Sequence, residues 1–118
     1  MKINIFILAL IVLTSKFSFA AFNEKETHEL NDINSLSELK LRSTTEKLKI
    51  AVDSAILDNP EKSEAILKLN EQWVKFIESK CKYENFESKG TDAEVYLMNN
   101  CLMKGYAEQV EYFSNLPP

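Results

Sequence analysis

Glycine and proline are scarce in this chain, and their scarcity limits the folds open to it. The 118 residues contain only two glycines and three prolines. A fold with many short strands needs more of both, because glycine supplies positive φ angles and proline fixes turns. The sequence therefore predicts a few long helices and disfavours a many-turned β fold.

The first twenty residues, MKINIFILALIVLTSKFSFA, have the pattern of a secretory signal peptide. Basic Lys2 precedes an apolar run over residues 3–13, and Ser18 and Ala20 are small residues at the positions that a signal peptidase reads. The alternative, an uncleaved anchor, is disfavoured because the apolar run is short for a membrane span. We expect a signal peptide over residues 1–20, a periplasmic or secreted location, and no stable membrane insertion after cleavage.

Removal of that segment would leave 98 residues, which suit one domain. They carry 12 basic and 18 acidic residues, a net charge of about −6. An acidic surface repels nucleic acid and favours basic partners through long-range steering. The alternative is that this modest charge only maintains solubility.

The chain has two cysteines, Cys81 and Cys101. In an exported protein they predict one disulfide bond, because that compartment is oxidising. The alternatives, a metal site or a reactive thiol, have no support: there is no Cys-x-x-Cys motif, and the single histidine, His28, lies far away in a polar segment. We expect no metal and no cofactor.

Residues 21–34 are polar and predict an N-terminal arm, either loose or a frayed turn, before a helical domain over residues 35–118. Ser35 and Glu38 have the capping-box spacing that predicts a helix start. Apolar residues then recur at helical intervals, namely Leu41, Leu48, Val52 and Ile56, with Ala51 and Ala55 beside them. Pro60 predicts the end of this helix at the residues before it.

A second helix is expected to begin at the same proline, with Asn59 as its N-cap. Its apolar stripe consists of Ile66, Leu69, Trp73, Phe76 or Ile77, and Cys81. Three oppositely charged i,i+4 pairs lie on the other face, namely Glu64–Lys68, Glu71–Lys75 and Glu78–Lys82. These pairs predict the solvated side of the helix rather than a binding stripe.

A loop over residues 83–90 separates this helix from a third one. Thr91 and Glu94 form a second capping-box pattern. The apolar residues of the third helix are Val95, Met98, Leu102, Val110 and Phe113. Gly105 lies inside this pattern at a cost of about 1 kcal/mol relative to alanine, which a close helix crossing would explain.

The elements together predict an all-α fold, a small three-helix bundle with a disulfide-stapled helical hairpin. Trp73 and Cys81 lie about 80° apart around their helix axis, so both can face one seam with Ile77 between them. A bond from Cys81 to Cys101 would join neighbouring antiparallel helices and stabilise the fold by about 3 kcal/mol. We expect Trp73, Ile77 and Leu102 to belong to the structural core.

The residues of this hairpin also carry a resemblance. Leu69-x-x-Gln72-Trp73, followed by Cys81, a loop and Cys101-Leu102, resembles the LprI-like lysozyme inhibitor family of small exported bacterial proteins. The resemblance covers about residues 67–116. It implies a helical fold and a function in binding and inhibiting a lysozyme-type hydrolase.

The chain departs from the family pattern at several positions. The family usually has an arginine four residues after the tryptophan, where this chain has Ile77. It favours threonine and arginine where this chain has Tyr106 and Gln109, and many members have a further cysteine pair near the mature N-terminus. The loop has Ser88-Lys89-Gly90-Thr91 in place of a Gly-Gly-Ser type run. The resemblance therefore carries more weight for the fold than for the activity.

Catalysis is disfavoured, because the sequence has one histidine, no glycine-rich phosphate loop and no nucleophile motif. The first hypothesis is a binding protein that occludes the cleft of a basic lysozyme-type hydrolase. A sharper version places Lys89 against the catalytic carboxylates of that enzyme, although a lysine in a polar loop is normally only solvated. The second hypothesis is a structural or protein-interaction module of the cell envelope without inhibitory activity.

Overall fold

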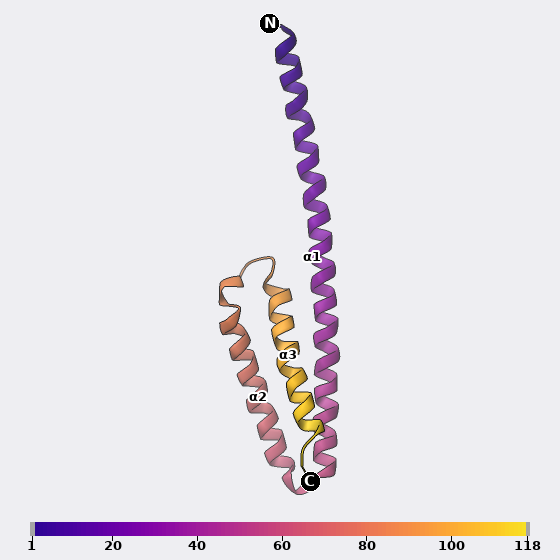
Figure 1. The fold of residues 1–118 in the computed structure, drawn as a ribbon, viewed down its shortest axis with the longest axis vertical. Helices are drawn as coiled ribbons and strands as arrows, with labels where there is room; N and C mark the ends of the chain where they lie inside the picture. Colours follow the sequence, from indigo (N-terminus) through magenta and orange to yellow (C-terminus); the bar gives the residue numbers. More distant parts are fainter. Residues whose placement is uncertain (1, 118) are drawn as a thin grey trace. The chain divides into compact units, whose positions relative to one another are not determined.

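Three α-helices account for most of the chain in the computed structural model, which describes residues 2–117 and the side chains of residues 23–117. They are α1 (Lys2–Asp58), α2 (Ser63–Glu84) and α3 (Glu94–Ser114), and the short 3-10 turns η1 (Pro60–Lys62) and η2 (Phe86–Ser88) lie between them (Figure 1). No strand occurs in this described part of the chain. The predicted all-α fold is confirmed.

The chain divides into two units after Ile33. Residues 2–33 form the first part of α1, where Thr27 Oγ1 donates a hydrogen bond of 2.7 Å to the carbonyl oxygen of Asn23. The side chains of the predicted signal peptide, residues 1–20, lie outside the described residues. Residues 34–117 contain the rest of α1, both other helices and the core, and the site considered below is built from this second unit alone.

The predicted start of the first helix at Ser35 is wrong, because α1 is already helical through residues 23–34. The predicted arm therefore continues the helix and is not a loose turn. The backbone N–H groups after Ser35 have carbonyl partners one turn earlier, so no capping box is needed there. Many residues of the polar segment, glutamate and lysine among them, are also good helix formers. The end of α1 at Asp58 agrees with the stop signal of Pro60.

Asn59 has a different role from the one predicted. Its side-chain Nδ2 donates to the carbonyl oxygen of Ala55 at 3.1 Å, so it satisfies the end of α1 and makes no cap bond to the next helix. Pro60 opens the 3-10 turn η1, and α2 begins only at Ser63. The proline thus stops one helix and starts a turn, whereas the sequence predicted a direct start of the second helix.

The buried face of α2 carries Ile66, Ile77 and Cys81. Between the two residues that the sequence left open, the structure buries Ile77 and leaves Phe76 64% exposed. The six residues of the three predicted charged pairs are exposed, which confirms the solvated face. In the described part of the chain only Glu71–Lys75 is formed among these pairs, at 2.7 Å, and its hydrogen bond and charge lower the pKa of Glu71.

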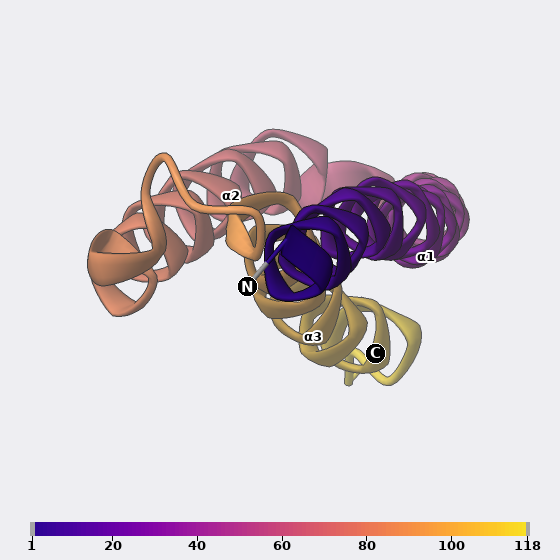
Figure 2. The same cartoon turned by 90° about the horizontal axis from the view of Figure 1, so that it is seen from above.

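Helices α2 and α3 run antiparallel as a hairpin, and Figure 2 shows the orange connection that joins them. The disulfide between Cys81 and Cys101 links the two helices, with a Cα–Cα distance of 5.7 Å. The predicted disulfide-stapled hairpin is therefore confirmed. Gly105 faces Ile77 of α2, which confirms the close helix crossing that would explain a glycine inside α3.

The core lies between the three helices of the second unit. Its buried apolar residues are Leu48, Ala51, Val52 and Ala55 from α1, Ile66, Ile77 and Cys81 from α2, and Tyr106 and Phe113 from α3. A polar contact also joins distant parts of the chain, since Asn99 Nδ2 donates to Ser37 Oγ at 3.0 Å. Among the residues with described side chains, no helix combines the length and apolar character that a membrane crossing requires.

Candidate functional site

The connection between α2 and α3 contains a tight turn over Ser88-Lys89-Gly90-Thr91, which we call the tip turn. Lys89 has φ −58° and ψ 127°, and Gly90 has φ +75°. The backbone N–H of Thr91 donates to the carbonyl oxygen of Ser88 at 3.0 Å. These values describe a type II β-turn with Lys89 and Gly90 at its two central positions. Gly90 is required because its left-handed φ strains any residue with a Cβ atom.

Side-chain hydrogen bonds hold the tip turn in place. Thr91 Oγ1 donates to the carbonyl oxygen of Ser88 at 2.6 Å, and the N–H of Gly90 donates to Oε2 of Glu94 at 2.8 Å. The predicted capping box of Thr91 and Glu94 is therefore wrong, since both side chains serve the turn and α3 begins at Glu94. Residues 91–93 form a bend and turn between Gly90 and the first residue of α3.

The same connection is also tied to α2. Asn85 donates from both its backbone N–H and its Nδ2 to the carbonyl oxygen of Cys81, at 3.0 and 2.9 Å. The next turn, η2, is closed by the N–H of Lys89 on the carbonyl oxygen of Phe86 at 3.2 Å. A chain of backbone contacts therefore runs from the disulfide to Lys89. The tip turn is a rigid extension of the hairpin.

Lys89 is exposed and has acidic neighbours along the chain. The stretch from residue 83 to residue 94 contains four carboxylates, those of Glu84, Glu87, Asp92 and Glu94, and Lys89 is its one basic residue. One of the four, Glu84, forms an ion pair with Lys80 of α2 at 2.9 Å. One exposed ammonium group thus stands within an acidic end of the hairpin. The ammonium group of Lys89 has one positive charge and three hydrogen-bond donors, and the nearby carboxylates surround it with negative charge.

The residues predicted for the hairpin core are brought together below the tip turn. Ile77 is 3% exposed, while Trp73 and Leu102 are partly buried against the core. The Trp73 ring lies 5.2 Å from that of Tyr112 and 6.2 Å from that of Phe113, between ring centroids. Trp73 therefore belongs to an aromatic cluster near the end of α3.

Sequence reasoning missed one fully buried polar residue, Gln109. Its Nε2 donates to Oδ1 of Asn70 at 2.7 Å and to the carbonyl oxygen of the same residue at 3.2 Å. Gln109 follows Leu102 and Tyr106 at helical spacing and precedes Phe113, so the apolar periodicity of α3 could have placed it in the core.

The three departures from the family pattern that lie within the helices share one environment. Ile77, Tyr106 and Gln109 are 3%, 8% and 0% exposed. Burial raises the pKa of the Tyr106 phenol, and the charge of Glu78 adds to that shift. These positions determine packing inside the bundle, and none of them contributes a side chain to the tip turn.

Among the residues with described side chains, no three His, Cys, Asp or Glu groups lie close enough to hold a metal ion. Comparison of the chain with protein-family models, with curated proteins and with solved structures finds no match.

Proposed function

We propose that this protein is an exported binding protein that inhibits a lysozyme-type glycoside hydrolase by occluding its substrate cleft. The observation that carries the proposal is the position of Lys89, exposed at the corner of a rigid turn at the end of a disulfide-stapled hairpin. The resemblance of Trp73, Cys81 and Cys101 to the spacing in LprI-like inhibitors supports the same function.

The charge pattern of the tip turn suits such a target. Glycoside hydrolases of this type act through a pair of carboxyl groups that must stay free. The ammonium group of Lys89 would bind these carboxylates, while the surrounding acidic residues would face a basic enzyme surface and steer the encounter. Because the turn is already ordered by its own hydrogen bonds, binding would lose little conformational entropy.

The departures from the family pattern inside the helices do not weigh against this function at the tip turn. Ile77 and Gln109 stand where the family has arginines, and both are buried. Their replacement changes the packing of the bundle, whereas a partner that approaches the tip turn meets Lys89 and its acidic neighbours. The tip turn itself also differs from the family pattern, because it has Ser88-Lys89-Gly90-Thr91 where the family has a Gly-Gly-Ser type run. The proposal for Lys89 therefore rests on the geometry of this chain.

A cell-wall lysis assay tests the proposal directly. The purified disulfide-bonded protein is titrated into a panel of lysozymes, with Lys89→Ala as the test variant and Lys82→Ala, another exposed lysine of the hairpin, as the matched control. We expect inhibition that weakens at least about tenfold in Lys89→Ala, as for a hot-spot residue, and is unchanged in Lys82→Ala. Equal inhibition by all three proteins would exclude the role of Lys89. If none of them binds any lysozyme, the inhibitor function itself is wrong.

The second candidate is a protein-interaction module of the cell envelope that inhibits no hydrolase. The exposed aromatic residues of the hairpin favour it, since Phe76, Tyr83 and Phe86 are 64%, 83% and 67% exposed. Aromatic side chains supply much of the binding energy in protein interfaces. Recovery of one identified non-lysozyme partner from envelope extract, confirmed with purified components and without any effect on lysis, would favour this candidate over the inhibitor.

A further inference from the structure

A groove of about 500 Å³ runs along the hairpin between α2 and α3. All of its lining residues come from these two helices and from Asn85, so it lies apart from both α1 and the tip turn. Ile77, the Cys81–Cys101 disulfide and Gly105 contribute to its lining. Gly105 has no side chain, and the side chain of Ile77 occupies the space where its Cβ atom would stand.

Aromatic residues from both helices line the groove, two from α2 and one from α3. Trp73 is partly buried, and its contacts with Tyr112 and Phe113 fix the orientation of its ring. Phe76 lies nearly one turn further along α2 and is 64% exposed, and Tyr96 of α3 is 42% exposed. These rings offer apolar faces to a ligand at a site that remains open to solvent.

The α3 side of the groove carries a row of polar residues after Tyr96 and Leu97. Asn100, Lys104 and Glu108 are spaced four residues apart, so they follow one another along the same face at steps of about 6 Å. Within residues 23–117, no hydrogen bond or ion pair engages the side chains of these three residues. An amide, an ammonium group and a carboxylate therefore remain available as donors and acceptors in a row.

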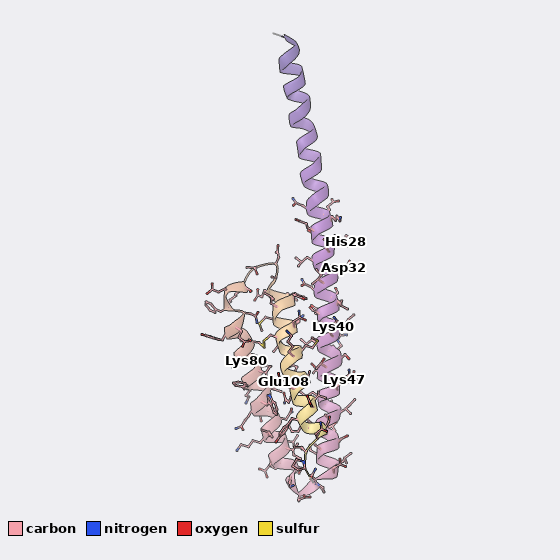
Figure 3. The ribbon with its side chains drawn as sticks, in the orientation of Figure 1. His28, Asp32, Lys40, Lys47, Lys80 and Glu108 are labelled. Atoms are coloured by element: carbon pink, nitrogen blue, oxygen red, sulfur yellow. A yellow bond between two sulfur atoms is a disulfide. The ribbon has the colours of Figure 1, made fainter. Side chains whose placement is uncertain are left out.

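The charges of the groove balance. Lys80 Nζ lies 2.9 Å from Oε1 of Glu84 on α2, and Lys104 and Glu108 contribute one charge of each sign on α3. Figure 3 labels Lys80 on α2 and Glu108 on α3, one from each helix of the groove. The four charges sum to zero, so the groove as a whole favours neither an anion nor a cation over a neutral ligand. The ligand that fits this lining is neutral and has both polar groups and apolar faces.

We propose that this groove binds a neutral oligosaccharide strand. A pyranose ring presents C–H groups on its face and hydroxyl groups at its edge, and the positive C–H groups suit the negative face of an aromatic ring. Trp73 and Phe76 would stack on the sugar faces, while Asn100, Lys104 and Glu108 would bind the hydroxyl groups of successive rings. This inference is independent of the inhibitor function, since it uses none of the residues of the tip turn.

A protein segment fits the groove less well. An extended peptide pairs its backbone with a free sheet edge, whereas both walls here are helices whose backbone groups bond within the helix. A bound amphipathic helix needs a mainly apolar groove, and the row from Asn100 to Glu108 would face it with unpaired polar groups. A proline-rich peptide, which needs only aromatic grooves, is the competing ligand that the experiment must distinguish.

The only tryptophan of the chain, Trp73, lines this groove and reports directly on binding. The disulfide-bonded protein is titrated with neutral β-linked tetrasaccharides of glucose or N-acetylglucosamine while tryptophan fluorescence is recorded. The test variants are Phe76→Ala and Asn100→Ala. The matched control is Tyr83→Ala, which removes an aromatic residue of the same helix that is 83% exposed and does not line the groove.

We expect a saturable change in fluorescence with at least one tetrasaccharide. Its dissociation constant should rise about tenfold or more in both test variants, equivalent to about 1.4 kcal/mol, and stay unchanged in Tyr83→Ala. Circular dichroism spectra identical to that of the wild type establish that the variants are folded. The proposal is overturned if no tetrasaccharide gives a saturable change, if Phe76→Ala and Asn100→Ala bind as the wild type does, or if only a proline-rich peptide saturates the signal.

Discussion

Gly105 of α3 lies directly against the side chain of Ile77 on α2. A Cβ atom built on Gly105 would stand 2.6 Å from Cγ2 of Ile77 and 3.0 Å from its Cγ1. No real Cβ atom tolerates the shorter distance, so the two helices can cross as they do only because position 105 has no side chain. The helix-breaking tendency of glycine is outweighed here by the contact that it permits.

Gly105→Ala should therefore destabilise the protein, although alanine is the better helix former. Overpacking in a core costs about 1–3 kcal/mol, and the gain in helix propensity returns about 1 kcal/mol. We expect a net loss of up to about 2 kcal/mol in urea unfolding. Ile77→Ala in the same chain should make room for the new methyl group, so the double variant should lose less than the sum of the single ones.

Gly90→Ala is the matched glycine control for that experiment. Nothing lies within 4 Å of a Cβ atom at Gly90, but its φ is +75°. The expected cost is about 1–2 kcal/mol of backbone strain, without any relief from Ile77→Ala. The losses of stability should be additive when Gly90→Ala is combined with Ile77→Ala. If they are also additive when Gly105→Ala is combined with Ile77→Ala, the predicted clash between residue 105 and Ile77 is wrong.

The disulfide should supply a large part of the stability. Breaking the bond between Cys81 and Cys101, which closes a loop with a sequence separation of 20, should lower the free energy of unfolding by about 3 kcal/mol. Urea unfolding with and without reductant measures the loss, and a Cys81→Ala, Cys101→Ala double variant serves as the control that reductant cannot change. A wild-type midpoint that reductant leaves unmoved would contradict the prediction.

Gln109 should tolerate an apolar replacement better than an acidic one. Its Oε1 is buried and accepts no hydrogen bond from the described residues, whereas its Nε2 binds Asn70, which is only partly buried. Gln109→Leu removes the unpaired acceptor and lets Asn70 turn to water, so we expect stability equal to or above that of the wild type.

Gln109→Glu places a carboxylate at the same buried position and should cost about 3 kcal/mol at neutral pH. Because burial would raise the pKa of that carboxyl, the lost stability should return as the pH falls below the raised value. Urea unfolding of both variants across the acidic range measures these effects. The interpretation fails if Gln109→Glu is as stable as the wild type at neutral pH.

Tyr106 should make the fold sensitive to alkali. Burial, with a contribution from the charge of Glu78, raises its pKa above the ordinary value of 10.0. The folded state therefore favours the neutral phenol, so this contribution is complete below about pH 10 and is lost as the pH rises through the raised pKa. Tyr106→Phe should reduce the loss of stability between about pH 8 and about pH 11. Tyr83→Phe, at an exposed position, should leave that loss in place; a loss that is the same in all three proteins would refute this role of Tyr106.

The sequence predicted the helices and their buried faces correctly but placed two helix starts wrongly. The apolar periodicity of residues 41–56 predicted the buried face of α1, and the scarcity of glycine and proline predicted long helices. Both are local patterns with strong physical causes, namely the 3.6-residue period and the backbone limits of those two residue types. The helix starts at Ser35 and Thr91 were wrong, because a capping-box spacing is a weak signal that neighbouring backbone hydrogen bonds override.

The candidate site, too, was predicted only in part from the sequence. Sequence alone named Lys89 as the loop residue that could meet a hydrolase, and it predicted the pairing of Cys81 with Cys101 because the chain has only these two cysteines. Sequence alone did not predict the type II turn that orders Lys89, since the hydrogen bond from Gly90 to Glu94 depends on where α3 begins. The rigidity of the tip turn is therefore a property of the folded hairpin.

The amino-acid order by itself determined the helical class, the break at Pro60 and the staple between Cys81 and Cys101. Only the tertiary structure decided that Ile77 rather than Phe76 faces the core and that Gln109 is buried. The physical reason is that a helix period defines a broad apolar face but not its centre. The exact centre depends on where the neighbouring helix approaches most closely, and in this protein Gly105 sets that approach.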